Sequence, residues 1–544
     1  MTDSKRIYNQ SISSYAIWSD EEYVNDEDRI DPSPNPFLDD EEVTKYYTAL
    51  YEQSDYECRH VFEPQLLWTV AEEKRIVSKL DGKIALFSCI LFAALEICRL
   101  NIRQALSDDF LADLNLTTND YNMGCTIFLV GFLLGEIPSS VLSKVVGVDR
   151  FVPFQIIAWS IVGMSQCFIT GRKTFFLCRG LSSIFMSGLI PELVTAMSSY
   201  YKSNELSVRL SWFWTTLSCI EIFASIVSPL ILKLRGTFGW EGWRFLFLIF
   251  NFSSFIIGLC SYCMLVPSPI ETKSRFYPQG WFNNREVSII VNRVLRDDPS
   301  KGDMNHRQSI EVKPLIRALL DYDLWPIYIL GFIAFIPKST IGSYLNIIMR
   351  NFGWSSSQIN YFAIPHFILH IYFLLETTKI SERFNQKALV ALLSPTFQLP
   401  LVLLLNFWNG AMVNAWGTWA ICTLIVGGPY IHAINVAWVS RNSGSIKTRA
   451  VASAMYNITV QLGSVVSANI YRQDDAPLYH RGNQQLLYLS LSVVPIILLV
   501  KAYYIWRNHT KRAHWQSMTP EEQSWYLNHT TDQGNKRLDF MFDS

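Results

Sequence analysis

Charged residues inside long apolar runs are the positions of this sequence at which chemistry is expected. The run 84–102 contains Glu96 and Arg99, three residues apart and therefore on neighbouring faces of a helix. Two interpretations of this pair stay open. The side chains form a structural ion pair, or Arg99 binds an anion, because a guanidinium holds the oxygens of a carboxylate or sulfonate by two parallel hydrogen bonds.

Three further carboxylates lie in apolar runs, where a charge costs from ~2.5 to ~10 kcal/mol or more and needs a partner or a watery cavity. They are Glu136, Glu192 and Glu221. Burial favours the neutral form of a carboxyl group, which is the property that a proton-coupling site requires. We expect Glu192 or Glu221 to carry a proton, with Glu136 as a third candidate. Pairing with a basic residue on another helix is the alternative.

Other polar side chains in the apolar runs are candidate ligands for an anion. Arg179 is a second guanidinium, and Lys338 could neutralise an anion or a carboxylate. His366 and His370 stand four residues apart, a spacing that can bind zinc, but no HExxH motif or cysteine pair accompanies them, so we expect no metal. For the other candidates, helix-to-helix hydrogen bonding is an equally good explanation; they are Asn101, His432, Asn435 and Asn457.

These residues require helices that cross a membrane. Hydrophobic residues make up 50% of the 544 residues and charged residues only 17%, which is typical of a polytopic membrane protein. About 20 apolar residues span the ~30 Å hydrocarbon core of a bilayer. Twelve such runs predict an all-α membrane protein with six helices in each half: 84–102, 121–143, 151–170, 174–198, 210–232 and 245–266, then 325–349, 358–378, 388–407, 415–439, 450–470 and 485–506.

The two halves carry similar charged turns. Asp149 and Arg150 follow the second run of the first half, and Glu382 and Arg383 follow the second run of the second half. Repeated halves of this kind indicate a duplicated transporter fold, with two pseudo-symmetric six-helix bundles. We expect these turns to act as gating residues that latch the halves together on the cytoplasmic face.

The chain is expected to divide into five regions. Residues 1–65 are acidic and poor in apolar residues, which predicts a disordered tail. The first bundle, with a leading amphipathic helix, follows over 66–266, then a central loop over 267–324, the second bundle over 325–506 and a polar tail over 507–544. Lysine and arginine concentrate in alternate loops, so both termini and the central loop are predicted to be cytoplasmic. A net charge of -1 without a basic stripe argues against nucleic acid as a partner.

Short motifs along the chain carry a resemblance to a known family. They include Arg99-Leu-Asn101-Ile102, Glu136-Ile-Pro138-Ser139, Gly147-Val-Asp149-Arg150, Gly188-Leu-Ile-Pro191, Gly242-Trp-Arg-Phe-Leu-Phe247 and Asp475-Ala-Pro477-Leu-Tyr479. In this order on twelve predicted spans, the sequence resembles the major facilitator superfamily, and within it the fungal allantoate permease family of anion:proton symporters. The resemblance covers residues 72–540.

The resemblance implies a proton-driven importer of small organic anions, such as carboxylate vitamins, ureido acids or sulfur compounds. Protons are the implied coupling ion, and we expect no other cofactor and no enzymatic site. Family members often carry an acid just before the span-one arginine and a glutamate two residues before the span-four glycine, where this chain has Cys98 and Met186. The binding chemistry is therefore expected to differ from the carboxylate-vitamin branch. The central-loop run 292–303 resembles a subgroup that includes sulfonate and cysteine carriers.

Two other functions stay open at this point. One is a nutrient sensor on a transporter scaffold, which signals through the acidic tail or the central loop, and the other is a facilitator without proton coupling. The expected location is the plasma membrane, with the endoplasmic reticulum and the vacuole membrane as alternatives. The expected partners are the lipid bilayer and a small organic anion, and the protein is expected to be a monomer.

Overall fold

The computed structural model describes residues 30–543, except 32–34, 39–40, 54–55, 267, 273–277, 303–319, 385, 444–445 and 531–533. Its described residues form helices joined by turns, and their only strand-like pairing is a single bridge between Ile30 and Thr69. They divide into two compact units. The accessory unit comprises the described parts of 1–84, 199–203 and 268–305, and the bundle unit comprises the rest.

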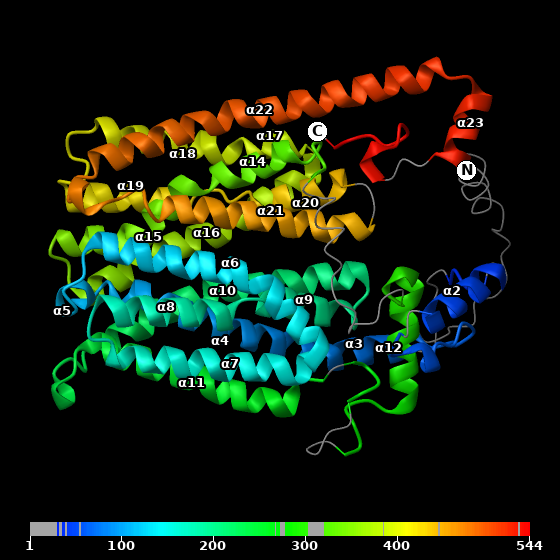
Figure 1. Cartoon of the computed structure of the whole chain (residues 1–544), viewed down its shortest axis with the longest axis horizontal. Coiled ribbons are helices and arrows are strands. Elements are labelled where there is room, and N and C mark those ends of the chain that lie inside the picture. The colour runs from blue at the N-terminus through cyan, green and yellow to red at the C-terminus, as the bar shows by residue number, and fades with distance from the viewer. Residues whose placement is uncertain are drawn as a thin grey trace, which may run out of the picture. The chain divides into compact units, whose positions relative to one another are not determined.

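The bundle unit consists of long helices that run side by side in Figure 1. The first half contains α4 (Leu86–Ala105), α5 (Phe110–Asp113), α6 (Thr118–Val146), α7 (Val148–Ser165), α8 (Arg172–Met186), α9 (Leu189–Ser198), α10 (Ser203–Leu232) and α11 (Gly242–Met264). The second half contains α14 (Trp325–Ala334), α15 (Ile336–Asn351), α16 (Ser356–Phe384), α17 (Lys387–Ala391), α18 (Leu393–Phe407), α19 (Ala415–Gly427), α20 (His432–Asn442), α21 (Ile446–Ser467), α22 (His480–Ser517) and α23 (Pro520–His529).

Twelve helical segments have the length of a membrane span. Ten segments of the described residues are both long and apolar enough to cross a membrane. Helices α6 and α21 add two more, because their 29 and 22 residues extend about 43 Å and about 33 Å at 1.5 Å per residue. The predicted all-α fold with twelve membrane helices is therefore confirmed.

Several spans are broken into two helices, and two of the breaks occupy corresponding places in the halves. The fourth span of the first half is interrupted between α8 and α9 at Ser187 and Gly188, and the fourth of the second half between α19 and α20. Gly188 has a φ of +84°, a conformation that favours glycine. Pro429, in the second break, has no amide hydrogen with which to continue a helix. Interrupted helices at matching positions are a pointer to the binding site of a repeat-built transporter.

The two halves contact each other along a small set of helices. Within the first half, α7 packs on α11 and α6 on α8; within the second, α14 packs on α21 and α18 on α22. Between the halves, α6 contacts α21 and α4 contacts α15. A side chain on α4, α6, α15 or α21 is therefore placed where one half can act on the other.

The accessory unit includes the described part of the predicted tail, within residues 30–65. It contains α2 (Glu41–Gln53), a 3-10 turn at Arg59–Val61, α3 (Val70–Leu80) and α12 (Asn284–Asp297). Phe37, Tyr51, Tyr56 and Cys58 form a buried cluster with Val291 and Leu295 of α12. The tail segment is too poor in apolar residues to fold alone, and its aromatic residues find their missing apolar partner in the central loop.

The last described residues fold back onto the second half. Helix α22 continues past the predicted end of the span at 506, to Ser517. Beyond α23, the segment 534–543 packs against α20 and α22. Trp438 Nε1 donates to Asp543 O at 2.7 Å, and Asn508 exchanges two hydrogen bonds with the backbone of Phe542. The ring of Phe542 belongs to the core of the second half. We call residues 534–543 the C-terminal segment.

Candidate functional site

Arg99 is paired with Glu96, as the structural interpretation of their spacing predicts. The Arg99 Nη1 and Glu96 Oε1 atoms are 2.8 Å apart on α4, and Glu96 is buried. The Arg99 guanidinium also lies 5.4 Å from the centre of the Phe132 ring of α6. Asn101, also on α4, is buried, and neither atom of its amide has a partner among the described residues. The charge of Arg99 is thus largely balanced, whereas the amide of Asn101 is available to a ligand.

Arg179 is a buried cation whose charge is not balanced. Its residue is only 7% exposed on α8, and Nε donates to Gly124 O at 3.5 Å. The guanidinium lies 4.3 Å from the centre of the Phe128 ring, which also faces Arg99 at 6.0 Å. Within the described part of the chain, no carboxylate lies within 4 Å of Arg179. The Arg179 guanidinium therefore has five N–H donors beside the Phe128 ring, and Gly124 O is the one acceptor given for them among the described residues.

Glu221 has a basic partner on another helix. Its Oε1 atom on α10 is 3.5 Å from Arg103 Nη1 on α4, so the alternative of structural pairing applies to this carboxylate. Arg103 also accepts a hydrogen bond across the two halves, from Asn346 Nδ2 of α15 to its carbonyl oxygen at 2.7 Å. Through Arg103, Glu221 is therefore connected to α4, one of the helices that contact the second half.

Glu192 is buried without a basic partner among the described residues. It lies in the first turn of α9, directly after the break at Gly188. Ser139 Oγ is 3.3 Å from Glu192 Oε1 and 2.8 Å from Ser187 O, and Gln155 Nε2 donates to the same Ser139 oxygen at 2.6 Å. Glu192 Oε2 has no partner in the described part of the molecule. Gln155 was not selected from the sequence, because only the fold brings α7 beside this break.

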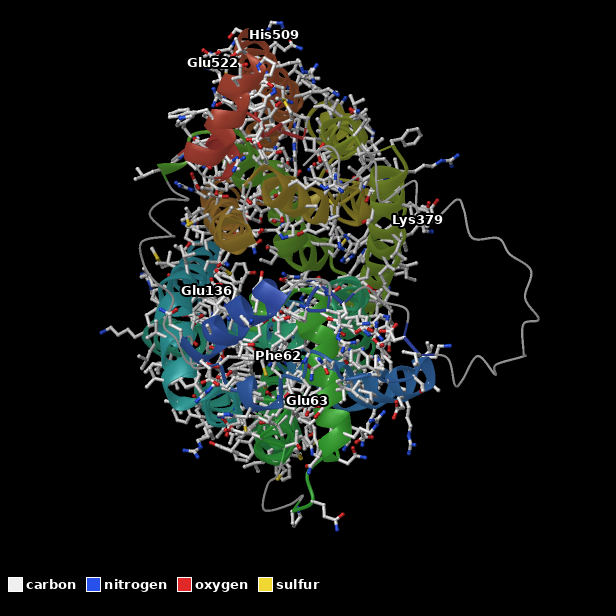
Figure 2. All side chains as sticks on the ribbon, turned by 90° about the vertical axis from the view of Figure 1, so that its right-hand side faces the viewer. Phe62, Glu63, Glu136, Lys379, His509 and Glu522 are labelled. Atoms are coloured by element: carbon white, nitrogen blue, oxygen red, sulfur yellow. The ribbon has the colours of Figure 1, made fainter. Side chains whose placement is uncertain are left out.

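Glu136 lies at the contact between the halves. It is half-buried on α6, which is cyan in Figure 2, where Glu136 is labelled. Its neighbour is Gln461 of α21, in the second half. Glu136 therefore borders the second half, whereas Glu192 contacts Ser139 within the first half.

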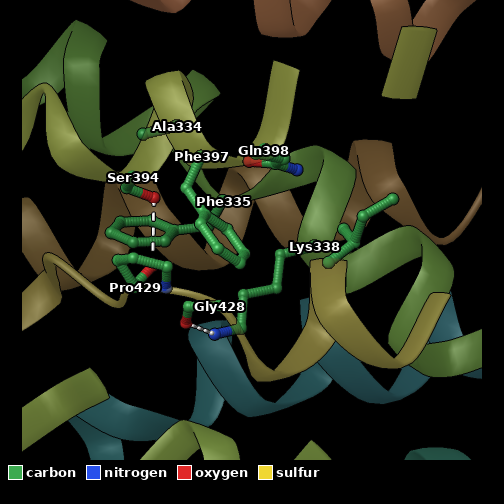
Figure 3. A pocket seen from close by; sticks show the side chains of 9 residues that line it. Ala334, Phe335, Lys338, Ser394, Phe397, Gln398, Gly428 and Pro429 are labelled. Carbon is green, nitrogen blue, oxygen red and sulfur yellow. Dashed lines mark hydrogen bonds between the residues drawn. The ribbon is translucent and has the colours of Figure 1, made fainter. Parts of the chain in front are cut away.

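Lys338, the predicted basic ligand of the second half, lies at the break in the tenth span. Figure 3 shows its side chain reaching from α15 to Gly428. Lys338 Nζ donates to Gly428 O at 3.1 Å and lies 3.0 Å from His370 Nδ1 of α16. Phe335, Phe397, Gln398 and Lys338 line a small pocket beside this break. The Lys338 ammonium lies 4.9 Å from the centre of the Tyr430 ring.

The other predicted ligands of the second half are spread around the same break. The His432 ring lies 5.8 Å from Tyr430 and 5.5 Å from Tyr456, measured between ring centres. His366 packs on Phe367 and is buried, as is Asn435 of α20. Asn457 of α21 is exposed and does not join this group.

The predicted gating turns are not joined in this structure. Asp149 Oδ2 is 3.8 Å from the Nε atom of its neighbour Arg150, and Arg383 is exposed. The side chain of Glu382 lies outside the described part of the structure. Among the described side chains, no ion pair connects the two turns.

The halves are instead joined at the opposite end of the bundle. The Tyr344 hydroxyl of α15 lies within hydrogen-bonding distance of Asn122 Oδ1 of α6 and of Tyr471 O and donates its single hydrogen to one of them, and Asn122 Nδ2 donates to Tyr471 O at 2.7 Å. Further contacts between the halves at this end are Arg350 with Asp109, Asn360 with Ser107 and Asn469 with Thr126. We call the group Asn122, Tyr344 and Tyr471 the closed gate. Its members are far apart in the sequence, and only the fold reveals them.

Comparison with known proteins now gives the family. The family model described as Major Facilitator Superfamily matches residues 86–468. The chain belongs to this superfamily. It is 38% identical to the uncharacterized transporter YIL166C of Saccharomyces cerevisiae over 534 residues, which are 98% of this chain and 97% of that relative. It is 22% identical to the MFS-type transporter efuF of Hormonema carpetanum, over 74% of this chain and 80% of that protein.

A solved superfamily structure has the same fold. The inward-facing, unoccupied bacterial homologue of the human lysosomal transporter Spinster matches with a TM-score of 0.56 and 14% identity, over 78% of this chain and 96% of that one. Superfamily membership, a transporter role and a multi-pass membrane location are therefore confirmed, and the chain is not an enzyme. The two halves are joined at the closed gate and are not joined at the charged turns of the opposite end. In a superfamily transporter with two such halves, this arrangement is one state of alternating access.

Proposed function

We propose that this superfamily member is a proton-coupled importer of a small organic anion, related to the allantoate permease family. The observation that carries the proposal is Arg179. A buried guanidinium without a carboxylate within 4 Å among the described residues is costly in a membrane, and a bound anion removes that cost. Arg99 lies near the same Phe128 ring as Arg179. It supplies a second guanidinium for the anion when its ion pair with Glu96 opens.

The proton is carried by Glu192 in this proposal. A hydroxyl group has one hydrogen, and Ser139 Oγ makes its shorter contact with Ser187 O. Ser139 Oγ can then accept a hydrogen bond from a protonated Glu192, which fits a neutral carboxyl better than a carboxylate. Glu221 is already paired with Arg103, and Glu136 lies apart near Gln461, so both are secondary candidates.

The orientation follows from the charged loops. With both termini in the cytoplasm, the closed gate lies on the outer side, and the Asp149 and Arg383 turns lie on the cytoplasmic side. The structure then corresponds to a carrier closed to the outside. The substrate class extends over carboxylate vitamins, ureido acids and sulfur compounds such as sulfonates or cysteine, and the carrier acts as a monomer in the plasma membrane.

Uptake into proteoliposomes tests the proposal. A panel of carboxylates, ureido acids and sulfonates is first screened for thermal stabilisation of the purified full chain, and the strongest ligand is then followed as a radiolabel. We expect accumulation only with an inwardly directed proton gradient, and a KM about 10- to 100-fold higher for Arg179→Gln. Lys173→Gln, which removes an exposed cation from the same helix, is the matched control. Accumulation that survives dissipation of the gradient contradicts proton coupling, and an unchanged KM contradicts the anion site.

A further inference from the structure

The break between α8 and α9 gathers oxygen atoms around Glu192. Ser139 Oγ of α6 is 3.3 Å from Glu192 Oε1 and 2.8 Å from Ser187 O, the carbonyl oxygen at the break. Gln155 of α7 reaches the same place, because its Nε2 atom is 2.6 Å from Ser139 Oγ and 2.9 Å from Ser187 O. Side chains of three helices and one backbone carbonyl therefore meet in a single group within the first half.

Ser187 O belongs to this group because no helical amide can bind it. In an unbroken helix, the carbonyl oxygen of residue 187 accepts a hydrogen bond from the amide of residue 191. Residue 191 is a proline, which has no amide hydrogen. The oxygen accepts from Ser139 and Gln155 instead. A carbonyl oxygen at the C-terminal end of a helix carries a partial negative charge, and it is a ligand that hard cations use.

The group contains buried acceptors that lack a donor. Glu192 Oε2 and Gln155 Oε1 have no hydrogen-bond partner in the described part of the chain, and their residues are only 6% and 2% exposed. Rotation of the Gln155 amide exchanges its oxygen and nitrogen atoms, which turns Oε1 toward Ser139 and Ser187. A buried acceptor without a donor is costly. A cation that is bound among these oxygen atoms removes the cost for both acceptors at once.

The charge and packing of the group select the kind of cation. Glu192 has no basic side chain within 4 Å among the described residues, so its single negative charge is neutralised by a monovalent cation. A divalent cation would leave a positive charge at membrane depth, which is costly. Oxygen ligands without sulfur or imidazole suit a hard ion rather than a transition metal. The packing is tight, since a Cβ atom at Gly188 would lie 2.3 Å from Ser139 Oγ and 3.1 Å from Glu192 Oε1. Tight packing favours a small alkali ion over potassium.

We propose that the break between α8 and α9 binds a small alkali cation, sodium or lithium, through four oxygen atoms. They are a carboxylate oxygen of Glu192, Ser139 Oγ, Ser187 O and Gln155 Oε1. The ion links α6 and α7 to the broken fourth span, so it favours the state of the carrier in which these ligands converge. The inference goes beyond the proposed function, because the site requires neither an anion nor a proton gradient. Sodium occupies it when Glu192 is ionised, in place of the proton.

Cation titrations of the purified full chain test the inference. The melting temperature is followed in sodium, lithium, potassium or choline chloride, at pH 8 and constant ionic strength. We expect saturable stabilisation by sodium or lithium, whereas potassium should need an at least about 10-fold higher concentration and choline should have no effect. Stabilisation by potassium at the same concentrations as sodium, or none by sodium and lithium, overturns the inference. A water molecule is then the partner of the two buried acceptors.

Three variants locate the ion. Glu192→Gln should abolish the stabilisation that is specific to the small ions, because the site loses its negative charge. Ser139→Ala should raise the sodium concentration for half-maximal stabilisation about 10-fold, because one ligand is lost. Glu376→Gln, which alters a side chain that is 40% exposed, is the control and should leave the titration unchanged. If Glu192→Gln fails to fold, Ser139→Ala and the four salts on the unaltered chain still decide the question.

The outcomes separate this inference from the proposed function. Stabilisation by sodium that survives Glu192→Gln places the ion elsewhere and overturns the site at the break, while anion import with protons is left standing. Conversely, accumulation of the anion without a proton gradient, measured in sodium-free buffer, contradicts proton coupling and leaves the cation site standing.

Discussion

At the scale of single residues, the balance of charge distinguishes groups of the same type. Glu192 is buried and Glu221 is half-buried, yet Glu221 has Arg103 within 3.5 Å, whereas Glu192 has no basic side chain within 4 Å among the described residues. Arg99 and Arg179 differ in the same way, since only Arg99 has a carboxylate beside it. A charged group that is neutralised by a neighbouring side chain stabilises the fold. A charged group without such a neighbour can respond to a proton or a ligand.

Replacing Glu192 by glutamine should uncouple transport from protons. The amide fits the space of the carboxyl group but cannot take up a proton, so we expect uptake driven by a proton gradient to fall at least about 10-fold. Exchange of labelled for unlabelled anion needs no net proton movement and should persist. Both activities are measured in proteoliposomes, with Glu376→Gln as control, because the Glu376 side chain of α16 is 40% exposed. Gradient-driven uptake at the normal rate would assign the proton to another group.

Part of this residue-scale picture could be predicted. The spacing of Glu96 and Arg99 on one helix predicted their contact, because residues three apart are neighbours on a helix. The isolation of Arg179 and Glu192 depends on which side chains other helices bring to them, and no local spacing encodes that. Gln155 and Lys338 show the same limit, since their partners lie on separate helices and, for Lys338, 90 residues away at Gly428.

At the scale of elements, the break between α8 and α9 depends on one glycine. Gly188 adopts a φ of +84°, and a Cβ atom there would lie 2.3 Å from Ser139 Oγ. The break directs the first turn of α9, and with it Glu192, toward Ser139. The sequence indicated a loosened helix at Gly188 and Pro191, but the matching break in the tenth span was not predicted, because the apolar run over 415–439 continues through it.

Gly188→Ala should destabilise the protein and impair transport together. Backbone strain and the collision with Ser139 together cost about 1–3 kcal/mol, which lowers the melting temperature of the purified chain. Gly82→Ala is the matched control, because no atom lies within 4 Å of the Cβ it would add and its φ is not positive. Equal melting temperatures for the two variants would show that the break tolerates a side chain.

The closed gate makes a second prediction at this scale. Tyr344→Phe removes the hydroxyl that lies between Asn122 Oδ1 and Tyr471 O, so the buried acceptor of its single hydrogen loses that partner. We expect the joined state to lose about 1–2 kcal/mol, which shifts the population between the two states about 5- to 30-fold. Distances between spin labels at the exposed positions 115 and 416 measure this shift. Tyr488→Phe, on an exposed tyrosine of α22, should not alter the distances.

At the scale of the whole molecule, segments distant in sequence complete one another. The aromatic residues of the N-terminal region cover α12 of the central loop, and the C-terminal segment covers α20 and α22. The twelve spans and their division into halves were predictable, because bilayer thickness fixes how long an apolar run must be. The packing of the described terminal segments was not, because residues 37–58 pack on α12 of the central loop and the C-terminal segment packs on α20, about 100 residues before it.

Asp323 anchors the C-terminal segment, and its contribution has a defined dependence on pH. Burial alone raises the pKa of this carboxyl, but hydrogen bonds from Arg507, Lys536 and Tyr503 outweigh burial and hold the pKa below its usual range. A lowered pKa means that the stabilisation is complete above ~4, the unfolded value, and is lost as the pH falls through the folded value.

Asp323→Asn should therefore destabilise the second half by a similar amount at pH 5 and pH 8. The loss is about 3–5 kcal/mol, because Arg507 loses its buried carboxylate partner and Lys536 keeps only Asp321. Melting temperatures of the two proteins at both pH values test this expectation. A difference between them that grows from pH 8 to pH 5 would show that another titrating group anchors the segment.

The docked C-terminal segment also limits how the protein can be labelled. Asp543 O accepts from Trp438 and Asn442, so a fluorescent protein or affinity tag appended after residue 544 begins one residue beyond an embedded contact. Such a fusion pulls on α20, the second helix of the interrupted tenth span. Microscopy with a C-terminal fluorophore would then report the whereabouts of a perturbed carrier, and antibody detection of the unmodified chain is the reference it requires.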